Sequence, residues 1–197
     1  MDAASVEQQI APWGWELVWR ALSTTWWVWL LPAALVTALA TGDLQILDYV
    51  HVLSAILWTG ADLFMGFIVG PVLRRLDAAS RMRVQPRLLP RTLLFFPVIS
   101  GTTTAAGWYL AQAMGFLEPS SPLYWWVVAA LIVVAFLTVQ GLGVLLPTNL
   151  RIYGMMLSPQ PDTDRIRRMM SRYLYLVGFQ GLLQLGIVFV MVHFVMG

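Results

Sequence analysis

Two histidines and one aspartate are the residues of this sequence best suited to chemistry inside an apolar protein. His51 precedes an apolar stretch, residues 53–70, in which Asp62 is the only ionisable group, and His193 lies near the C-terminal end of the sequence. Two neutral imidazoles can hold one haem iron or one metal ion. A haem b with His51 and His193 as axial ligands is therefore one hypothesis. The alternative is that each imidazole is bonded to a backbone carbonyl or to water.

Asp62 lies on a helical stripe that begins at His51. At 100° per residue, the positions that share this face are His51, Ser54, Ala55, Trp58, Asp62 and Met65. We predict that the stripe points inward and that Trp58 lines a cofactor site. A carboxylate inside a membrane is costly unless it is protonated, paired or hydrated. Asp62 could thus carry a proton or bind a substrate, or it could be a protonated carboxyl bonded to hydroxyls in residues 92–116.

The C-terminal segment offers a second ligand set. Met191, His193 and Met196 form the pattern M-x-H-x-x-M, and thioether plus imidazole is a soft combination that suits Cu(I). Methionine in an apolar helix more often serves packing alone. Gln180 and Gln184 are one turn apart in the same segment, and we expect them to bond across the bundle to Gln140 or Thr138.

Composition places the chain in a membrane. Hydrophobic residues make up 59% of its 197 residues and charged residues 11%, and the mean hydropathy is +0.72. A soluble domain of this length could not bury that much apolar surface. The sequence has no cysteine and no lysine, which excludes thiolate ligands and Schiff-base chemistry. The formal charge of +2 reflects arginines in loops, so we expect no nucleic-acid partner.

Hydropathy predicts an all-α membrane protein with five transmembrane helices. Residues 1–24 are expected to form an amphipathic helix, from Val6 to Leu22, that lies in the headgroup layer and is anchored by tryptophans. Residues 25–197 form the five-helix domain. The predicted spans are about 25–41, 46–73, 92–116, 124–146 and 173–195. We expect Pro32 to kink the first span and Pro147 to end the fourth.

Arginines predict the orientation. Ten of them lie in the connections between spans two and three and between spans four and five, at positions 74, 75, 81, 83, 87, 91, 151, 165, 167 and 168, and the other two connections have none. By the positive-inside rule, the N-terminus is cytoplasmic and the C-terminus is outside, as in a bacterial-type inner membrane. His51 and His193 then lie at the same depth near the outer face. The run from Arg74 to Arg91 is expected to be a lipid-facing loop, or a binding site for propionates or an anionic substrate.

The segment 47–60, LDYVHVLSAILWTG, resembles a helix opening of the form H-V-x-x-x-x-x-W-x-G. This opening is shared by PuuD-type membrane urate hydroxylases, CopD-type copper-resistance proteins and HemJ-type protoporphyrinogen oxidases. Leu89-Pro90-Arg91-Thr92-Leu93 and Leu146-Pro147-Thr148-Asn149 are similar to further elements of the first of these families. The resemblance covers about residues 46–195, and His51 matches the shared histidine. The sequence departs from the urate hydroxylase pattern at Tyr173 and Leu174, where that family continues its S-R element with T-N, and the HemJ lysine has no counterpart.

The resemblance implies a helical membrane domain associated with haem or redox work. One expected function is a haem b-binding subunit of an oxidoreductase complex, which passes electrons between a partner redox protein and quinone or another acceptor. There Asp62 would handle protons. A second is a non-catalytic accessory subunit of a larger membrane complex, and a third is CopD-like copper transport. Enzyme activity of the isolated chain is not expected, because the sequence has no nucleophile with a base partner and no phosphate loop.

Overall fold

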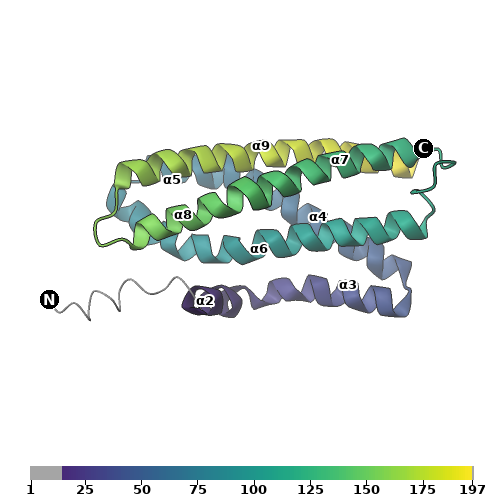
Figure 1. Ribbon diagram of the computed structural model, residues 1–197, viewed down its shortest axis with the longest axis horizontal. Coiled ribbons are helices and arrows are strands. Elements are labelled where there is room, and N and C mark those ends of the chain that lie inside the picture. The colour runs from purple at the N-terminus through teal and green to yellow at the C-terminus, as the bar shows by residue number, and fades with distance from the viewer. Residues whose placement is uncertain (1–14, 197) are drawn as a thin grey trace.

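The protein is an all-α bundle with five helices long and apolar enough to cross a membrane. A computed structural model describes residues 15–196 (Figure 1). The elements are α2 (Trp15–Thr25), the 3₁₀ turn η1 (Trp26–Trp29), α3 (Leu30–Thr41), α4 (Leu44–Phe64), the π-helical turn η2 (Met65–Val69), α5 (Gly70–Arg75), α6 (Ala78–Ala113), α7 (Tyr124–Gln140), the π-helical turn η3 (Gly141–Leu145), α8 (Leu146–Leu157) and α9 (Thr163–Met196). This confirms the predicted fold class.

The N-terminal helix α2 lies across the direction of the bundle. In Figure 1 it is seen nearly end-on beside the long helices, and α3 then runs along the bundle axis. The turn η1 carries three exposed tryptophans, Trp26, Trp27 and Trp29, between the two helices. Such residues favour the membrane interface. The predicted helix starts at Val6, but residues 6–14 lie outside the described part of the chain.

Two predicted arginine loops are helical instead. The helix α6 begins at Ala78 rather than near Thr92, and α9 begins at Thr163 rather than near Tyr173. Asp77 caps α6 by accepting a hydrogen bond from the Ser80 backbone at 2.9 Å, and bonds from Ser80 lower the pKa of this carboxyl. Arg81 is buried and donates to the carbonyls of Leu73 and Leu76, at 3.2 and 2.8 Å. This side chain therefore closes the end of α5 and does not face lipid.

The fourth span does not end at Pro147 as predicted. It continues from α7 through η3 into α8 and ends at Leu157. A proline lacks the N–H that an α-helix requires, but η3 shifts the hydrogen-bond pattern just before it, so Pro147 occupies the first turn of α8, where no N–H is needed. The other π-helical turn, η2, interrupts the second span directly after Phe64.

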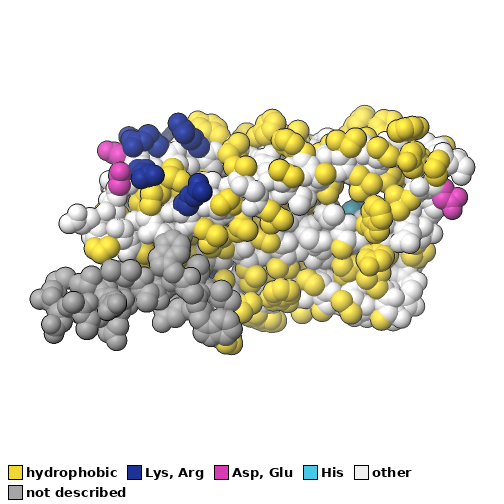
Figure 2. Space-filling model, in the orientation of Figure 1, with side chains coloured by type: hydrophobic (Ala, Val, Ile, Leu, Met, Phe, Trp, Pro, Cys, Tyr) yellow, Lys and Arg dark blue, Asp and Glu magenta, His cyan; other side chains and the backbone are white. Residues whose placement is uncertain are grey.

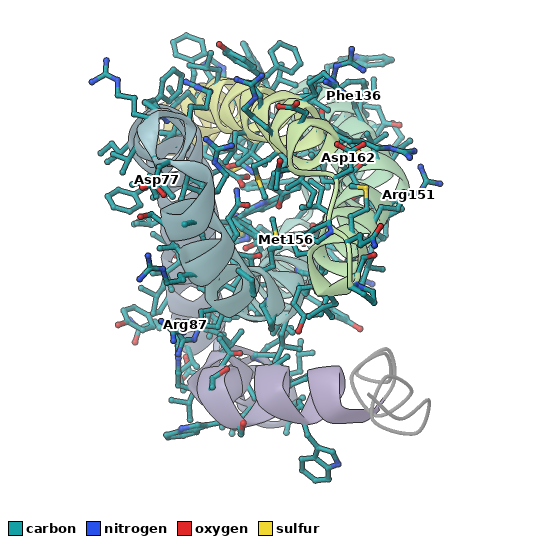
Figure 3. The ribbon with its side chains drawn as sticks, turned by 90° about the vertical axis from the view of Figure 1, so that its left-hand side faces the viewer. Asp77, Arg87, Phe136, Arg151, Met156 and Asp162 are labelled. Carbon is teal, nitrogen blue, oxygen red and sulfur yellow. The ribbon has the colours of Figure 1, made fainter. Side chains whose placement is uncertain are left out.

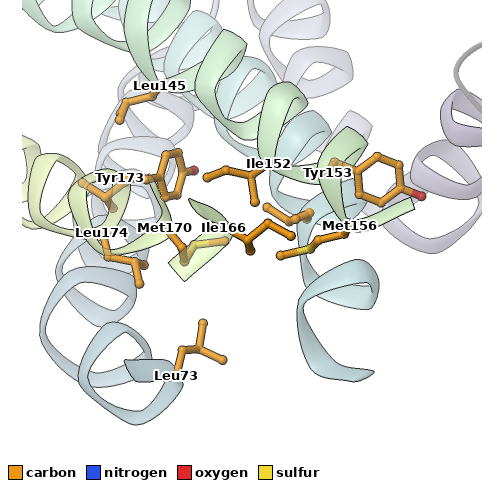
Figure 4. Packing of buried hydrophobic residues seen from close by; sticks show 11 residues of the cluster. Leu73, Leu145, Ile152, Tyr153, Met156, Ile166, Met170, Tyr173 and Leu174 are labelled. Atoms are coloured by element: carbon orange, nitrogen blue, oxygen red, sulfur yellow. The ribbon is translucent and has the colours of Figure 1, made fainter. Parts of the chain in front are cut away.

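Three clusters of buried side chains hold the helices together. Figure 4 shows the largest, in which Ile152 and Met156 of α8 meet Ile166 and Tyr173 of α9 near the arginine-rich end. A second cluster joins α3, α4 and α6 toward the opposite end, and a third surrounds Trp58 in the middle. Figure 3 looks onto the end that carries Asp77, Arg151 and Asp162, and shows the helices packed around this interior. The exposed surface between the two ends is largely apolar, as in Figure 2.

Glycines let α4 and its continuation cross α9 at very close range. A Cβ atom added to Gly66 would lie 2.8 Å from the Gly178 nitrogen, and one added to Gly181 would lie 2.9 Å from a methyl group of Leu63. Small residues at such a crossing let helix backbones meet in a membrane. The crossing lies within one turn of Asp62, so it also determines which α9 side chains this carboxyl meets.

We therefore expect Gly66→Ala to destabilise the protein by about 1–3 kcal/mol, because the added methyl group meets the backbone of α9. Gly60→Ala is the matched control, since a Cβ at Gly60 on the same span meets nothing within 4 Å. Thermal unfolding of both variants in detergent measures the effect. Equal melting temperatures would show that the crossing at Gly66 has no energetic importance.

Candidate functional site

Asp62 is held by two glutamines of α9. The carboxyl is 1% exposed, and the side-chain amides of Gln180 and Gln184 each donate to its Oδ2 atom at 2.8 Å. These partners correct two predictions. The hydroxyls of α6 do not bind Asp62, because Thr102 and Thr103 bond to carbonyls of their own helix. The glutamines do not reach Gln140 either, whose amide donates to the Leu176 carbonyl at 3.1 Å.

The predicted inward stripe of α4 is confirmed for Ser54, Trp58 and Asp62, which are all buried. The hydroxyl of Ser54 is satisfied within the helix by the Val50 carbonyl at 2.6 Å. The indole nitrogen of Trp58 is different, because it lies beside the Asp62 carboxyl without completing a hydrogen bond. Trp58 therefore places a buried N–H donor next to the carboxyl.

A cavity of about 540 Å³ lies beside Asp62. One wall is α6, and the facing wall is the stretch from Leu137 through η3 to Asn149. Trp58, Asp62 and Gln180 contribute to the lining, and so do the rings of Phe96, Trp108 and Tyr109. Ligand sites in proteins fall in this size range and combine apolar walls with a few polar groups.

A second polar group lies in the same cavity. The amide of Asn149 donates to the hydroxyls of Thr92 and Tyr173, at 3.3 and 3.4 Å, and all three residues line the space. Its oxygen Oδ1 is buried and has no hydrogen-bond partner among the described residues. The same holds for the Oε1 atoms of Gln180 and Gln184. Sequence reasoning noted Asn149 and Tyr173 only in the comparison with the urate hydroxylase pattern and gave neither a function, because their proximity depends on how α6, α8 and α9 meet.

His51 is fixed against α6. Its Nδ1 atom lies 2.9 Å from the Thr103 backbone oxygen. A Cβ atom added to Gly107 would lie 2.6 Å from Cε1 of the ring, so the imidazole rests directly on this glycine. This carbonyl bond is what an interfacial histidine would make, and it is also the bond by which metal-binding histidines are oriented.

His193 packs against Trp126 of α7, with ring centroids 4.2 Å apart and the ring planes tilted by 37°. The two histidines thus contact different helices, and their pairing on one iron stays a prediction. Met191 is partly buried, and Met196 is the last residue of α9. Within residues 15–196, no three side chains of the types His, Cys, Asp and Glu form a group that could hold a metal ion.

Comparison with known proteins adds no family. No protein-family profile, curated protein or solved structure matches this chain. The resemblance to the urate hydroxylase, copper-resistance and protoporphyrinogen oxidase families therefore stays a prediction.

We predict that Asp62 and its two glutamines are energetically coupled. Asp62→Leu should destabilise the protein by about 1–3 kcal/mol, because two buried amides lose their acceptor. Gln180→Leu and Gln184→Leu should then lower the free energy of unfolding less in the Asp62→Leu protein than in the wild type. The difference is the coupling energy, which we expect to be about 0.6–1.7 kcal/mol. Thermal unfolding in detergent gives these energies.

The control for this cycle is Ser54→Ala, two turns earlier on the same face of α4. The Ser54 hydroxyl bonds only to carbonyls of its own helix. It should show no coupling to the glutamines. Strictly additive effects of Asp62→Leu and the glutamine changes would contradict the coupling.

Proposed function

We propose that this protein is a haem b-binding membrane redox subunit in which His51 would hold the iron. The observation that supports this function is the 2.9 Å contact between Nδ1 of His51 and the Thr103 carbonyl. A carbonyl oxygen can only accept a hydrogen bond, so Nδ1 carries the proton and Nε2 keeps its lone pair. Histidines that bind metals are held in the same way, with the second nitrogen bonded to a carbonyl.

Gly107 supports the same role for His51. Because a glycine faces the ring, α6 can approach it closely and hold it in one orientation. Haem b, when bound, would supply one-electron transfer. His51 would hold the iron, the Thr103 carbonyl would orient the imidazole, and Asp62 would hold a proton farther along α4. His193 is proposed as the second residue that would hold the iron, on the basis of the matched depth of the two histidines.

The proposed partners are a redox protein that supplies or receives electrons and a lipid-soluble acceptor such as a quinone. In this role the chain is the electron-transfer subunit of an oxidoreductase complex. The proposed location is a bacterial-type inner membrane with the arginine-rich end in the cytoplasm. Figure 2 shows the dark blue arginines gathered at one end, and the C-terminus lies at the opposite end in Figure 1.

The haem proposal predicts a reduced b-type spectrum, with Soret and alpha bands, for the purified protein. We expect His51→Ala to abolish both bands, because the iron loses its ligand. Gly107→Ala should shift the bands or lower the haem content, because the new methyl group meets the ring. Gly101→Ala on the same helix is the control, since a Cβ there meets nothing within 4 Å. Pyridine hemochrome analysis gives the haem content.

Other results would reverse the assignment. An accessory subunit would be identified instead if the protein contains no haem and copurifies with a fixed membrane partner. The complex should then keep its activity when both histidines are replaced. Copper bound in membranes grown with copper, and lost on replacing Met191 and His193, would identify copper transport. In the haem case, His193→Ala should remove the six-coordinate spectrum if this residue is the second ligand.

The orientation has its own test, because the sequence lacks cysteine. Ser120 and Ser158 are exposed residues in the turns at opposite ends of the bundle. In intact cells, we expect a membrane-impermeant maleimide to label Ser120→Cys and to leave Ser158→Cys unlabelled until the cells are opened. The reverse pattern would place the arginine-rich end outside and would contradict the proposed topology.

A further inference from the structure

The cavity beside Asp62 opens sideways through the apolar surface of the bundle. Its lining includes Trp108, Tyr109 and Leu142, which are 48%, 42% and 55% exposed on the outside of the helices. These residues belong to α6 and η3, within the spans that are apolar enough to cross a membrane. A molecule that reaches the cavity by this route comes from the lipid phase, so its body must be apolar.

The deep part of the cavity is polar, and several of its polar atoms have no hydrogen-bond partner among the described residues. Asp62, Trp58, Gln180 and Asn149 line it, and each of these side chains is more than nine-tenths buried. Among residues 15–196, no donor reaches the amide oxygens of Gln180 and Asn149, and the Trp58 indole nitrogen lies beside the Asp62 carboxyl without a hydrogen bond of ordinary geometry. A carboxylate accepts hydrogen bonds only, so both glutamines turn their nitrogens to Asp62 and present their oxygens elsewhere. Buried polar atoms without partners are costly, and these oxygens have almost no accessible surface, so a ligand that donates hydrogen bonds satisfies them when the side-chain amides turn toward the cavity.

The acceptors form two groups along the cavity. Asp62 and Gln180 make the first, and Asn149 makes the second with Thr92 and Tyr173. Tyr173 and Gln180 are seven residues apart on α9, or roughly 10 Å along the helix axis. A ligand that suits both groups carries two hydroxyls on opposite sides of a small apolar body. A fatty acid fails because its carboxylate would meet that of Asp62, and an acyl chain has no donor.

We propose that this cavity binds the ring of a lipid-soluble hydroquinone. One hydroxyl donates to Asp62 or the Gln180 oxygen, and the other donates to the Asn149 oxygen. The ring lies among the aromatic side chains Phe96, Trp108 and Tyr109, where aromatic surfaces pack favourably. The isoprenoid tail leaves between α6 and η3 into the lipid. This site uses none of the ligands proposed for haem, so it stands independently of iron at His51.

The test measures binding of decylubiquinol to the full-length protein in nanodiscs of synthetic phosphatidylcholine that contain no quinone. Bound and free probe are separated by gel filtration and quantified after extraction. We expect saturable binding at one site per chain. Decylubiquinone, which has no hydroxyl to donate, should bind about tenfold more weakly, the scale of one hydrogen bond to a charged or buried acceptor.

Two glycines of the same π-helical turn provide a matched pair of variants. A Cβ at Gly141 or at Gly143 meets nothing within 4 Å, but only Gly141 lines the cavity. Gly141→Leu should fill the space and weaken decylubiquinol binding at least tenfold, by about 1.4 kcal/mol or more. Gly143→Leu should leave it unchanged. Asp62→Asn should weaken binding about tenfold, because the charge that strengthens the hydrogen bond is lost.

The proposal is overturned if uptake of the probe is not saturable and simply follows the amount of lipid, which would mean that acyl chains fill the cavity. It is also overturned if Gly141→Leu and Gly143→Leu bind decylubiquinol equally, or if the oxidised probe binds more tightly than the reduced one. The binding assay needs no electron transfer. If the protein binds decylubiquinol as expected but shows no haem spectrum, only the haem proposal is refuted.

Discussion

The carboxyl group of Asp62 must find polar partners inside an apolar bundle, and much of the structure follows from that need. A carboxylate surrounded by lipid-facing helices is stable only if other groups bond to it. Gln180 and Gln184 supply two such bonds, and they can reach Asp62 because Gly66 and Gly178 let the two spans touch. Hydrogen bonding and close packing thus depend on one another at this crossing. Neither glutamine could serve a carboxyl on a helix held at an ordinary distance.

The π-helical turn η3 determines which later side chains of the fourth span face the cavity. A π turn adds one residue, so the buried face of the helix continues five positions on instead of three or four. On the fourth span, Gln140 and Leu145 are successive buried positions across η3, and Asn149 follows one turn later. Without the added residue, Asn149 would be turned by about 100° away from the cavity. The same turn tolerates Pro147, which explains how a proline can lie inside this span.

The sequence predicts the parts of the fold that depend on local pattern. Apolar length was enough for the five spans, and the 100° periodicity of α4 correctly placed Ser54, Trp58 and Asp62 inward. The errors concern a π-helical turn and contacts between different helices. Pro147 looked like a helix end because a π turn has no clear sequence signal, and Arg81 looked lipid-facing because its acceptors lie on the preceding helix. The partners of Asp62 depend on the glycine crossing, whose register a single sequence does not specify.

One helix carries both candidate sites, and this has a consequence for coupling between them. His51 and Asp62 are eleven residues apart on α4, or roughly 16 Å along its axis, with Trp58 between them on the same face. His51 is bonded to α6, while Asp62 is bonded to α9. A ligand that changes the charge or the bonding of Asp62 therefore acts on the contact between α4 and α9. The resulting displacement reaches the imidazole of His51 only if α4 moves as a rigid helix. The bonds of His51 and Asp62 attach α4 to two different helices. A substitution at the crossing of Gly66 and Gly178 displaces α4 itself, so it can affect both sites at once.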